Sequence, residues 1–216
     1  GLAAGTYDLV ARDAGSCTAV SIATVTEPPV LIAGVTPDPA EVCASVALAL
    51  DGNPVDGTGT YTTHLWTGDT GPLSSTAIAA PSFNSGATGT FKMRYSVTDD
   101  NGCNVTDSID VIVNANPTSA IIPDPANACD GVTLSVDGNP AGGSGTYVTH
   151  LWTGATGPLS STSIVAPDFN AGPGSYALTY TVTDDNGCIG TDGITVTADT
   201  NTTAAVAGPT QNLCNI

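Results

Sequence analysis

Positive charge is nearly absent from this chain, and its absence excludes several classes of protein. The 216 residues include 3 Lys and Arg against 20 Asp and Glu, which gives a formal net charge of −17. A nucleic-acid-binding protein needs clustered cations to neutralise phosphates, and a polybasic membrane anchor needs them at an anionic surface. The sequence also lacks a run of about 20 apolar residues, the length that spans a bilayer as a helix. We therefore expect neither nucleic-acid binding nor membrane insertion.

Charged residues that favour helices are also scarce. Lys and Arg are nearly missing and Glu occurs only at positions 27 and 41, whereas Gly, Thr, Ala, Val and Ser are abundant. This composition suits short strands and turns better than helices. Only 11% of the residues are charged, which differs from the composition of a disordered acidic segment. The composition therefore predicts a folded, all-β chain.

Signatures of catalysis are missing as well. The sequence contains no G-x-S-x-G motif and no C-x-x-C pair, and His64 and His150 lie far from any cysteine. A nucleophilic serine of the hydrolase type and a zinc site are therefore disfavoured. The adjacent carboxylates Asp99–Asp100 and Asp184–Asp185 come at strand ends, where neighbouring side chains point to opposite faces. Glycoside hydrolysis needs two carboxylates that face each other. We expect no enzymatic activity.

The dominant feature of the sequence is an internal repeat. The segment TPDPAEVCASVALALDGNP at 36–54 returns as IPDPANACDGVTLSVDGNP at 122–140, and YSVTDDNGC at 95–103 returns as YTVTDDNGC at 180–188. Shorter pieces at both ends match the same frame. The predicted organisation is a C-terminal repeat fragment at 1–29, whole repeats at 30–116 and 117–201, and an N-terminal repeat fragment at 202–216.

Each whole repeat has the pattern of short, half-buried strands. Met93, Tyr95 and Val97 alternate with polar residues, and equivalent alternation recurs in the second repeat. Asn-Gly turns and other Gly-, Pro- and Asp-rich turns separate these runs. About seven short strands in a repeat of this size are typical of an immunoglobulin-like β-sandwich. We predict tandem sandwiches of this type, with Trp66 and Trp152 buried in their cores.

Several of these residues carry a resemblance to a known family. The recurring Y-x-V-T-D-x-N-G-C strand and turn, the cysteine before the second strand and the central tryptophan resemble the PKD-like repeats of very large bacterial surface proteins. Segment 5–29 is similar to short repeats of the gliding-motility adhesins of Bacteroidota-type bacteria. The resemblance covers essentially the whole chain. It departs at one loop, where W-T-G at Trp66 replaces the usual W-D-F-G-D-G. The resemblance implies an extracellular repeat protein.

Carboxylates near the ends of the repeats are candidate calcium ligands, because calcium takes several oxygen ligands. The candidates are Asp38, Asp99, Asp100, Asp124, Asp184 and Asp185. The sequence has no D-x-D-x-D-G calcium loop, so the alternative is that these acids are solvated turn formers. No other cofactor is expected.

The cysteines are even in number and are distributed regularly over the repeats. There are six, and an even count in an acidic, Thr- and Gly-rich chain favours an oxidising, extracellular setting. In a sandwich of this kind, the first strand would carry Cys43 away from the end where the chain enters. The long strand before Cys103 runs back to that end. About six residues at roughly 3.3 Å each would separate the two by about 20 Å, whereas a disulfide needs Cα atoms within about 7 Å.

A disulfide between successive repeats follows from these directions. If sandwiches stack in line, the far end of one meets the near end of the next, which pairs Cys43 with Cys188. By the same rule Cys103 pairs with a cysteine upstream of Gly1, and Cys129 with one downstream of Ile216. The four cysteines with expected partners outside the chain are Cys17, Cys103, Cys129 and Cys214.

Repetition itself indicates a structural function. An enzyme needs one site, whereas near-identical units in a row provide length. We expect a stalk or filament at the cell surface, adhesive to cells or surface glycans, whose partners are adjoining repeats or copies of itself. The alternative is a carbohydrate-binding or spacer module of a secreted hydrolase. Aromatic residues make up only 5% of the chain, which disfavours the exposed aromatic platform that a sugar-binding module uses.

Overall fold

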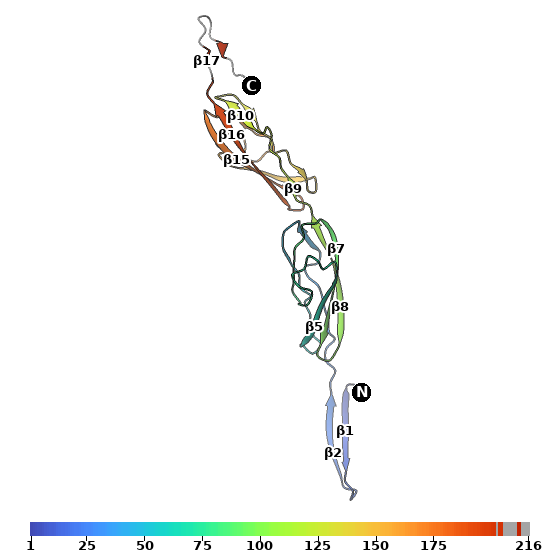
Figure 1. Cartoon of the computed structure of the whole chain (residues 1–216). Coiled ribbons are helices and arrows are strands. Elements are labelled where there is room, and N and C mark those ends of the chain that lie inside the picture. The colour runs from blue at the N-terminus through green and yellow to red at the C-terminus, as the bar shows by residue number, and fades with distance from the viewer. Residues whose placement is uncertain (202, 205–210, 213–216) are drawn as a thin grey trace. The chain divides into compact units, whose positions relative to one another are not determined.

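The computed structural model describes residues 1–201, 203, 204, 211 and 212 (Figure 1). These residues form strands, turns and loops and no helix, as the composition predicts. In this described part of the chain, nothing has the helical length and apolar character needed to cross a bilayer.

The described strands contain between 2 and 11 residues. In chain order they are β1 (Gly5–Arg12), β2 (Thr18–Val25), β3 (Ala40–Cys43), β4 (Leu48–Ala49), β5 (Tyr61–Gly68), β6 (Ser82–Phe83), β7 (Gly89–Asp99), β8 (Asn104–Asn114), β9 (Pro117–Thr118), β10 (Ala126–Cys129), β11 (Leu134–Ser135), β12 (Ala141–Gly142), β13 (Tyr147–Gly154), β14 (Asp168–Phe169), β15 (Gly174–Asp184), β16 (Ile189–Asp199), β17 (Thr203–Ala204) and β18 (Gln211–Asn212).

The chain forms two compact units whose boundary differs from the boundary of the sequence repeat. Unit 1 comprises Gly1–Ala40, Ala47–Asn84 and Phe91–Val111, and unit 2 comprises Glu41–Val46, Ser85–Thr90 and Ile112–Ile216. Three short segments of the first repeat, among them the one with Cys43, therefore belong to unit 2. The sequence repeat shows which segments have similar sequences, whereas a compact unit depends on which segments pack together.

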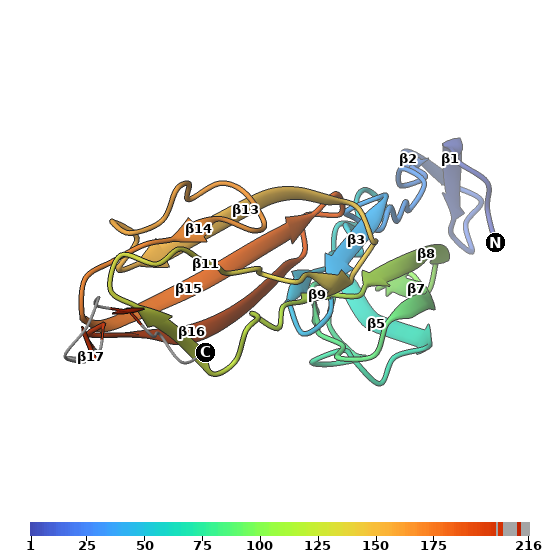
Figure 2. The same ribbon diagram turned by 90° about the horizontal axis from the view of Figure 1, so that it is seen from above.

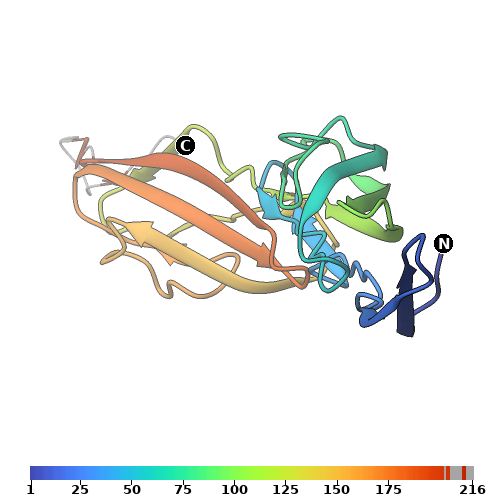
Figure 3. The same cartoon turned by 90° about the horizontal axis from the view of Figure 1, so that it is seen from below.

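Each repeat contributes one four-stranded sheet and smaller strand pairs. The large sheets have the strand orders β3-β8-β7-β5 and β10-β16-β15-β13. The pairs β4-β6 and β11-β14 form small second sheets, and β9 pairs with β12. Figures 2 and 3 show β13, β15 and β16 side by side in the second repeat. Trp152 on β13 lies opposite Tyr180 on β15, as Trp66 on β5 lies opposite Tyr95 on β7.

The first strand of each repeat pairs with two different neighbours. It begins with a bridge between Thr36 and Asp51, which recurs as Ile122 with Asp137. Prolines then interrupt the ladder, because proline has no N–H to donate. In the second repeat the chain continues as β10, which runs parallel to β16. After this change of neighbour, Cys129 lies at the end of β10, as the predicted direction of the first strand requires.

The sandwich cores are built from the alternating residues identified in the sequence. Trp66 and Trp152 are buried, which confirms their predicted place in the core. The core of unit 2 includes Val136, Trp152, Phe169, Leu178, Tyr180, Val182 and Val196. Along β15 every second residue from Leu178 is buried. Side chains of a strand point alternately to the two faces of a sheet, so period 2 produces one apolar face.

Candidate functional site: the cysteine turns

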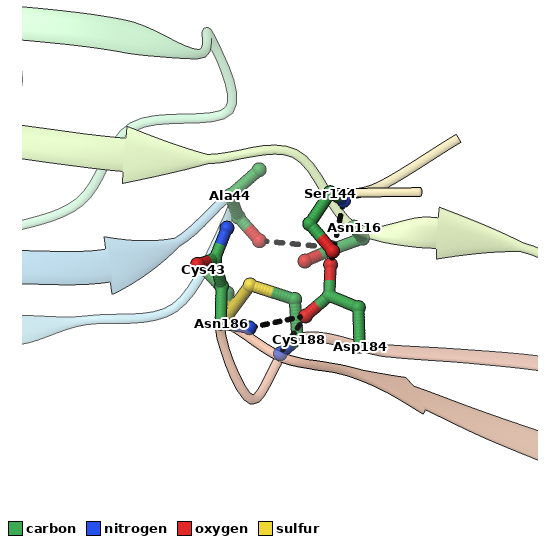
Figure 4. Close-up of a disulfide and its surroundings, with 7 residues drawn as sticks. All are labelled: Cys43, Ala44, Asn116, Ser144, Asp184, Asn186 and Cys188. Atoms are coloured by element: carbon green, nitrogen blue, oxygen red, sulfur yellow. Dashed lines mark hydrogen bonds between the residues drawn. A yellow bond between two sulfur atoms is a disulfide. The ribbon is translucent and has the colours of Figure 1, made fainter. Parts of the chain in front are cut away.

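The last hairpin of each repeat is built around one buried aspartate. Asp99 and Asp184 are 1% and 0% exposed, although ionisable side chains are rarely buried to this extent. Oδ1 of Asp184 accepts hydrogen bonds from the backbone N–H groups of Asn186 and Cys188, at 3.1 and 2.8 Å. Its Oδ2 accepts a third from Ser144 N–H, at 3.0 Å (Figure 4). The carboxylate thus ties the hairpin turn to the loop that precedes β13.

Asp99 makes the same contacts in the first repeat. Its Oδ1 accepts hydrogen bonds from Asn101 N–H at 3.1 Å and Cys103 N–H at 2.8 Å. Its Oδ2 accepts one from Thr58 N–H at 3.3 Å. Gly102 has φ 81°, a left-handed conformation that glycine adopts without steric cost. The sequence Asp-Asp-Asn-Gly-Cys therefore encodes a turn that holds the cysteine in a fixed place.

The hairpin of β1 and β2 contains a third turn of this kind. Asp13 Oδ1 accepts a hydrogen bond from Cys17 N–H at 2.9 Å, and the N–H of Asp13 donates to the carbonyl of Cys17 at 3.0 Å. Ser16, with φ 70°, takes the position of Gly102. We call these three segments, Asp13–Cys17, Asp99–Cys103 and Asp184–Cys188, the cysteine turns. In each, an aspartate fixes the backbone of the cysteine four residues later.

Cys43 is the last residue of β3 and begins a different recurring turn. The N–H of Ala44 donates to the carbonyl of Asn114 at 2.9 Å. The side-chain amide of Asn116 donates to the carbonyl of Ala44 at 3.1 Å (Figure 4). The carbonyl of Cys43 accepts the N–H of Val46 at 3.1 Å and closes the turn. We call this segment, 43–46, the asparagine-clamped turn.

The same clamp recurs after β10 in the second repeat. The N–H of Asp130 donates to the carbonyl of Asp199 at 2.8 Å, and the side-chain amide of Asn201 donates to the carbonyl of Asp130 at 2.9 Å. The carbonyl of Cys129 accepts the N–H of Val132 at 2.9 Å. Sequence reasoning missed Asn116 and Asn201. Their recurrence in the repeat, two residues after the end of a long strand, is the signal that could have found them.

A disulfide joins one turn of each kind. Cys43 is bonded to Cys188, with 5.5 Å between their Cα atoms and 145 residues between them in sequence (Figure 4). Both cysteines belong to unit 2, yet Cys43 comes from the first sequence repeat and Cys188 from the second. This is the pairing expected from the strand directions. Cys188 is fully buried, at 0% exposure.

The other cysteines have different environments. Cys17 and Cys103 are free thiols and are exposed. Cys129 is disulfide-bonded within this chain, which corrects the expectation that its partner lies beyond Ile216. The strand directions place Cys129 at an end of its sandwich but do not determine which cysteine meets it there. Cys214 lies outside the described residues.

The candidate calcium ligands do not come together. The described residues contain no group of three or more His, Cys, Asp or Glu side chains that could hold a metal ion. The carboxylates of Asp99 and Asp184 accept backbone hydrogen bonds instead, and both oxygens are engaged. The remaining candidates, Asp38, Asp100, Asp124 and Asp185, are exposed. These positions fit the alternative of turn-forming and solvated acids, and calcium binding by them stays a prediction.

The two histidines take part in a polar network that also recurs. Nδ1 of His64 shares a hydrogen bond of 2.6 Å with the hydroxyl of Tyr95, and His150 pairs with Tyr180 in the same way. Burial, with a smaller contribution from Asp51, raises the pKa of Tyr95 to about 12. Burial and Asp137 raise the pKa of Tyr180 to about 12. The histidines are therefore hydrogen-bonded neighbours of the core.

Comparison with known proteins identifies the fold. No family model and no curated protein sequence matches the chain. Among solved structures, it is similar to the N-terminal eight immunoglobulin domains of the Down syndrome cell adhesion molecule, with a TM-score of 0.50 and 14% identity over 93% of this chain and 28% of that one.

Two further solved structures have TM-scores of 0.49. They are the three N-terminal domains of the outer capsid protein Hoc of bacteriophage RB49, 10% identical over 92% of this chain and 80% of that one, and a C-terminal fragment of intimin, 15% identical over 77% and 63%. At such identities a likeness concerns the fold alone. With the strand order and the core, the comparison shows an all-β chain of tandem immunoglobulin-like domains.

Proposed function

We propose that this chain is a structural segment of an extracellular stalk or filament, built from sandwich repeats that are covalently joined. The observation that carries the proposal is the Cys43–Cys188 disulfide, which links a residue of one sequence repeat to a residue of the next. A bond at this place limits separation of the two repeats under load. A binding domain that acts alone has no need of such a link.

The chemistry of the chain supports a surface location. Disulfides persist in oxidising compartments such as the cell exterior. A net charge of −17 keeps neighbouring molecules apart and soluble. Adhesion to cells or surface glycans is part of the proposal, with adjoining repeats as the main partners of this segment. We propose no catalytic activity.

The side chains favour the stalk over a carbohydrate-binding module. A sugar-binding surface commonly presents flat aromatic rings to the solvent. Every Trp, Tyr and Phe side chain of this chain is buried or half-buried. The rings serve the cores instead: Trp66 packs against Tyr95, with ring centroids 4.9 Å apart, and Phe83 packs against Phe91.

Small-angle X-ray scattering tests the proposal. We would compare the 216-residue chain with chains in which one or two extra copies of residues 117–201 follow Asn201. A stalk lengthens by a constant step for each repeat. That step is about 35 Å, the length of an 11-residue strand such as β15. Steps below about 10 Å per added repeat, typical of repeats that collapse into a cluster, would contradict the stalk.

A further inference from the structure

The three cysteine turns have one backbone structure and two chemical states. Asp99–Cys103 and Asp184–Cys188 share every hydrogen bond described above, with equal distances between the aspartate Oδ1 and the cysteine N–H. Cys188 is nevertheless buried in a disulfide, whereas Cys103 is an exposed free thiol. Since the local structure is the same, the difference lies in what each turn meets.

What Cys188 meets is the asparagine-clamped turn of Cys43. This turn is held by its own backbone bonds and by Asn116, and it recurs at Cys129 with Asn201. Both halves of the Cys43–Cys188 linkage are therefore repeated parts, each held by contacts within its own repeat. The linkage is one observed pairing between a cysteine turn and an asparagine-clamped turn.

Within this chain Cys103 cannot form a disulfide with Cys43, because Cys43 is already bonded to Cys188. The buried carboxylate of Asp99 holds the Cys103 backbone in the arrangement that Cys188 has in its disulfide. A thiol held in this way meets a matching partner with less loss of conformational freedom than a mobile thiol.

We propose that Cys103 is a cross-linking site, which forms a disulfide with the asparagine-clamped cysteine of another repeat of the same kind. Two thiols are oxidised to one S–S bond, and their two electrons and two protons reduce a disulfide oxidant to two thiols. The inference rests on the proposed function, because it names the bond through which the stalk is extended or joined to a neighbour.

A mixed-disulfide experiment tests this pairing directly. The donor is the full chain with Cys17→Ser, in which Cys103 is the thiol under test. The acceptor is the full chain with Cys17→Ser, Cys103→Ser and Cys188→Ser, which frees Cys43. The two are mixed in oxidised and reduced glutathione, and the linked peptides are identified by mass spectrometry without reduction.

The control donor has an exposed thiol outside a cysteine turn: Ser175→Cys in the background of Cys17→Ser and Cys103→Ser. We expect Cys103 to form the bond with Cys43 at least about tenfold faster than the control thiol, and to prefer it to a Cys103–Cys103 bond. Equal rates, or a dominant Cys103–Cys103 product, would overturn the proposal. Circular dichroism checks that the acceptor is folded. If it is not, the unmodified Cys43–Cys188 bond serves as acceptor through thiol exchange, and the same two rates are compared.

Two further arms separate the outcomes. In the parent protein isolated without reductant, a Cys103 cross-link to another molecule produces species that an electrophoresis gel separates by mass, whereas a link to another repeat of the same molecule does not. The scattering and mixed-disulfide experiments together distinguish the two proposals. If the chain with Cys103 intact lengthens with repeat number but forms no Cys103–Cys43 bond, the cross-linking site fails and the stalk remains.

Discussion

The interiors of the two repeats are nearly identical, whereas their outer faces and their cysteine turns differ. Trp66 and Trp152 each donate a hydrogen bond of 2.9 Å from Nε1, to the carbonyls of Ile78 and Ile164. By contrast, Lys92 and Arg94 on β7 are replaced by Ala177 and Thr179 on β15.

The cysteine turns differ only in state, since Cys103 is free and Cys188 is bonded. The comparison teaches that the sequence of one repeat is enough for its core and its turn. The bonding state of the cysteine depends on a partner from elsewhere. The predictions below test how far the two repeats are equivalent.

The largest expected effect is the loss of a core tryptophan. Trp66→Ala and Trp152→Ala should each lower the free energy of unfolding of their own repeat by roughly 3–5 kcal/mol, because each leaves a cavity beside a buried tyrosine. Hydrogen exchange of peptides from β7 and β15 measures the free energy of unfolding of the two repeats separately. The remaining tryptophan provides a fluorescence control for the repeat that was not changed. A cost below about 1 kcal/mol in one repeat would break the equivalence of the cores.

A smaller loss is expected from the buried aspartates. Asp99→Asn and Asp184→Asn should each cost roughly 1.5–3 kcal/mol, because the amide accepts charge-assisted hydrogen bonds less well than the carboxylate. Urea unfolding measures the effect, and the exposed neighbour Asp100→Asn serves as the matched control. Equal losses would show that the turn, present in both repeats, supplies the stability. A loss confined to Asp184→Asn would assign it to the disulfide.

Alkaline pH should weaken both repeats. The folded pKa values of Tyr95 and Tyr180 are raised to about 12, from 10.0. This stabilisation is fully present below pH 10 and is lost as the pH rises through 12, because the unfolded tyrosines ionise first. Urea midpoints at pH 9 and pH 11.5 measure the loss. Tyr95→Phe should reduce the pH dependence of the first repeat and leave that of the second unchanged. An unaltered dependence in the first repeat would exclude Tyr95 as its source.

The smallest effect should come from the ion pair that only the first repeat has. Lys92 Nζ lies 2.9 Å from Asp110 Oδ2, and both side chains are largely exposed. Since solvent screens such pairs, Lys92→Ala should change the free energy of unfolding by less than about 0.5 kcal/mol. Thermal melts at low and high salt measure it. The reverse change, Ala177→Lys, adds a cation opposite Thr195 and is the control. A loss above about 1 kcal/mol would mean that the outer faces are not equivalent in stability.

Much of the architecture could be predicted from the repeat and the period of two. Both predict strands with one buried face and a core tryptophan, because pleating alternates side chains between faces. The Cys43–Cys188 pair also followed from the strand directions. The predicted calcium ligands were chosen by residue type alone. In the structure, the carboxylates of Asp99 and Asp184 accept hydrogen bonds from backbone N–H groups. Composition cannot distinguish this use of a carboxylate from metal ligation.

The sequence alone determined the strands, the turns and the cores, because each depends on residues that are close along the chain or paired by alternation. The cysteine turn is an example, since Asp184 reaches N–H groups two and four residues away. Only the tertiary structure decided that the segment around Cys43 packs as part of unit 2. It also decided that Cys188 is bonded whereas the equivalent Cys103 is free. A pairing across 145 residues depends on where whole sheets end in space, and equivalent cysteines in near-identical repeats carry no local signal that tells them apart.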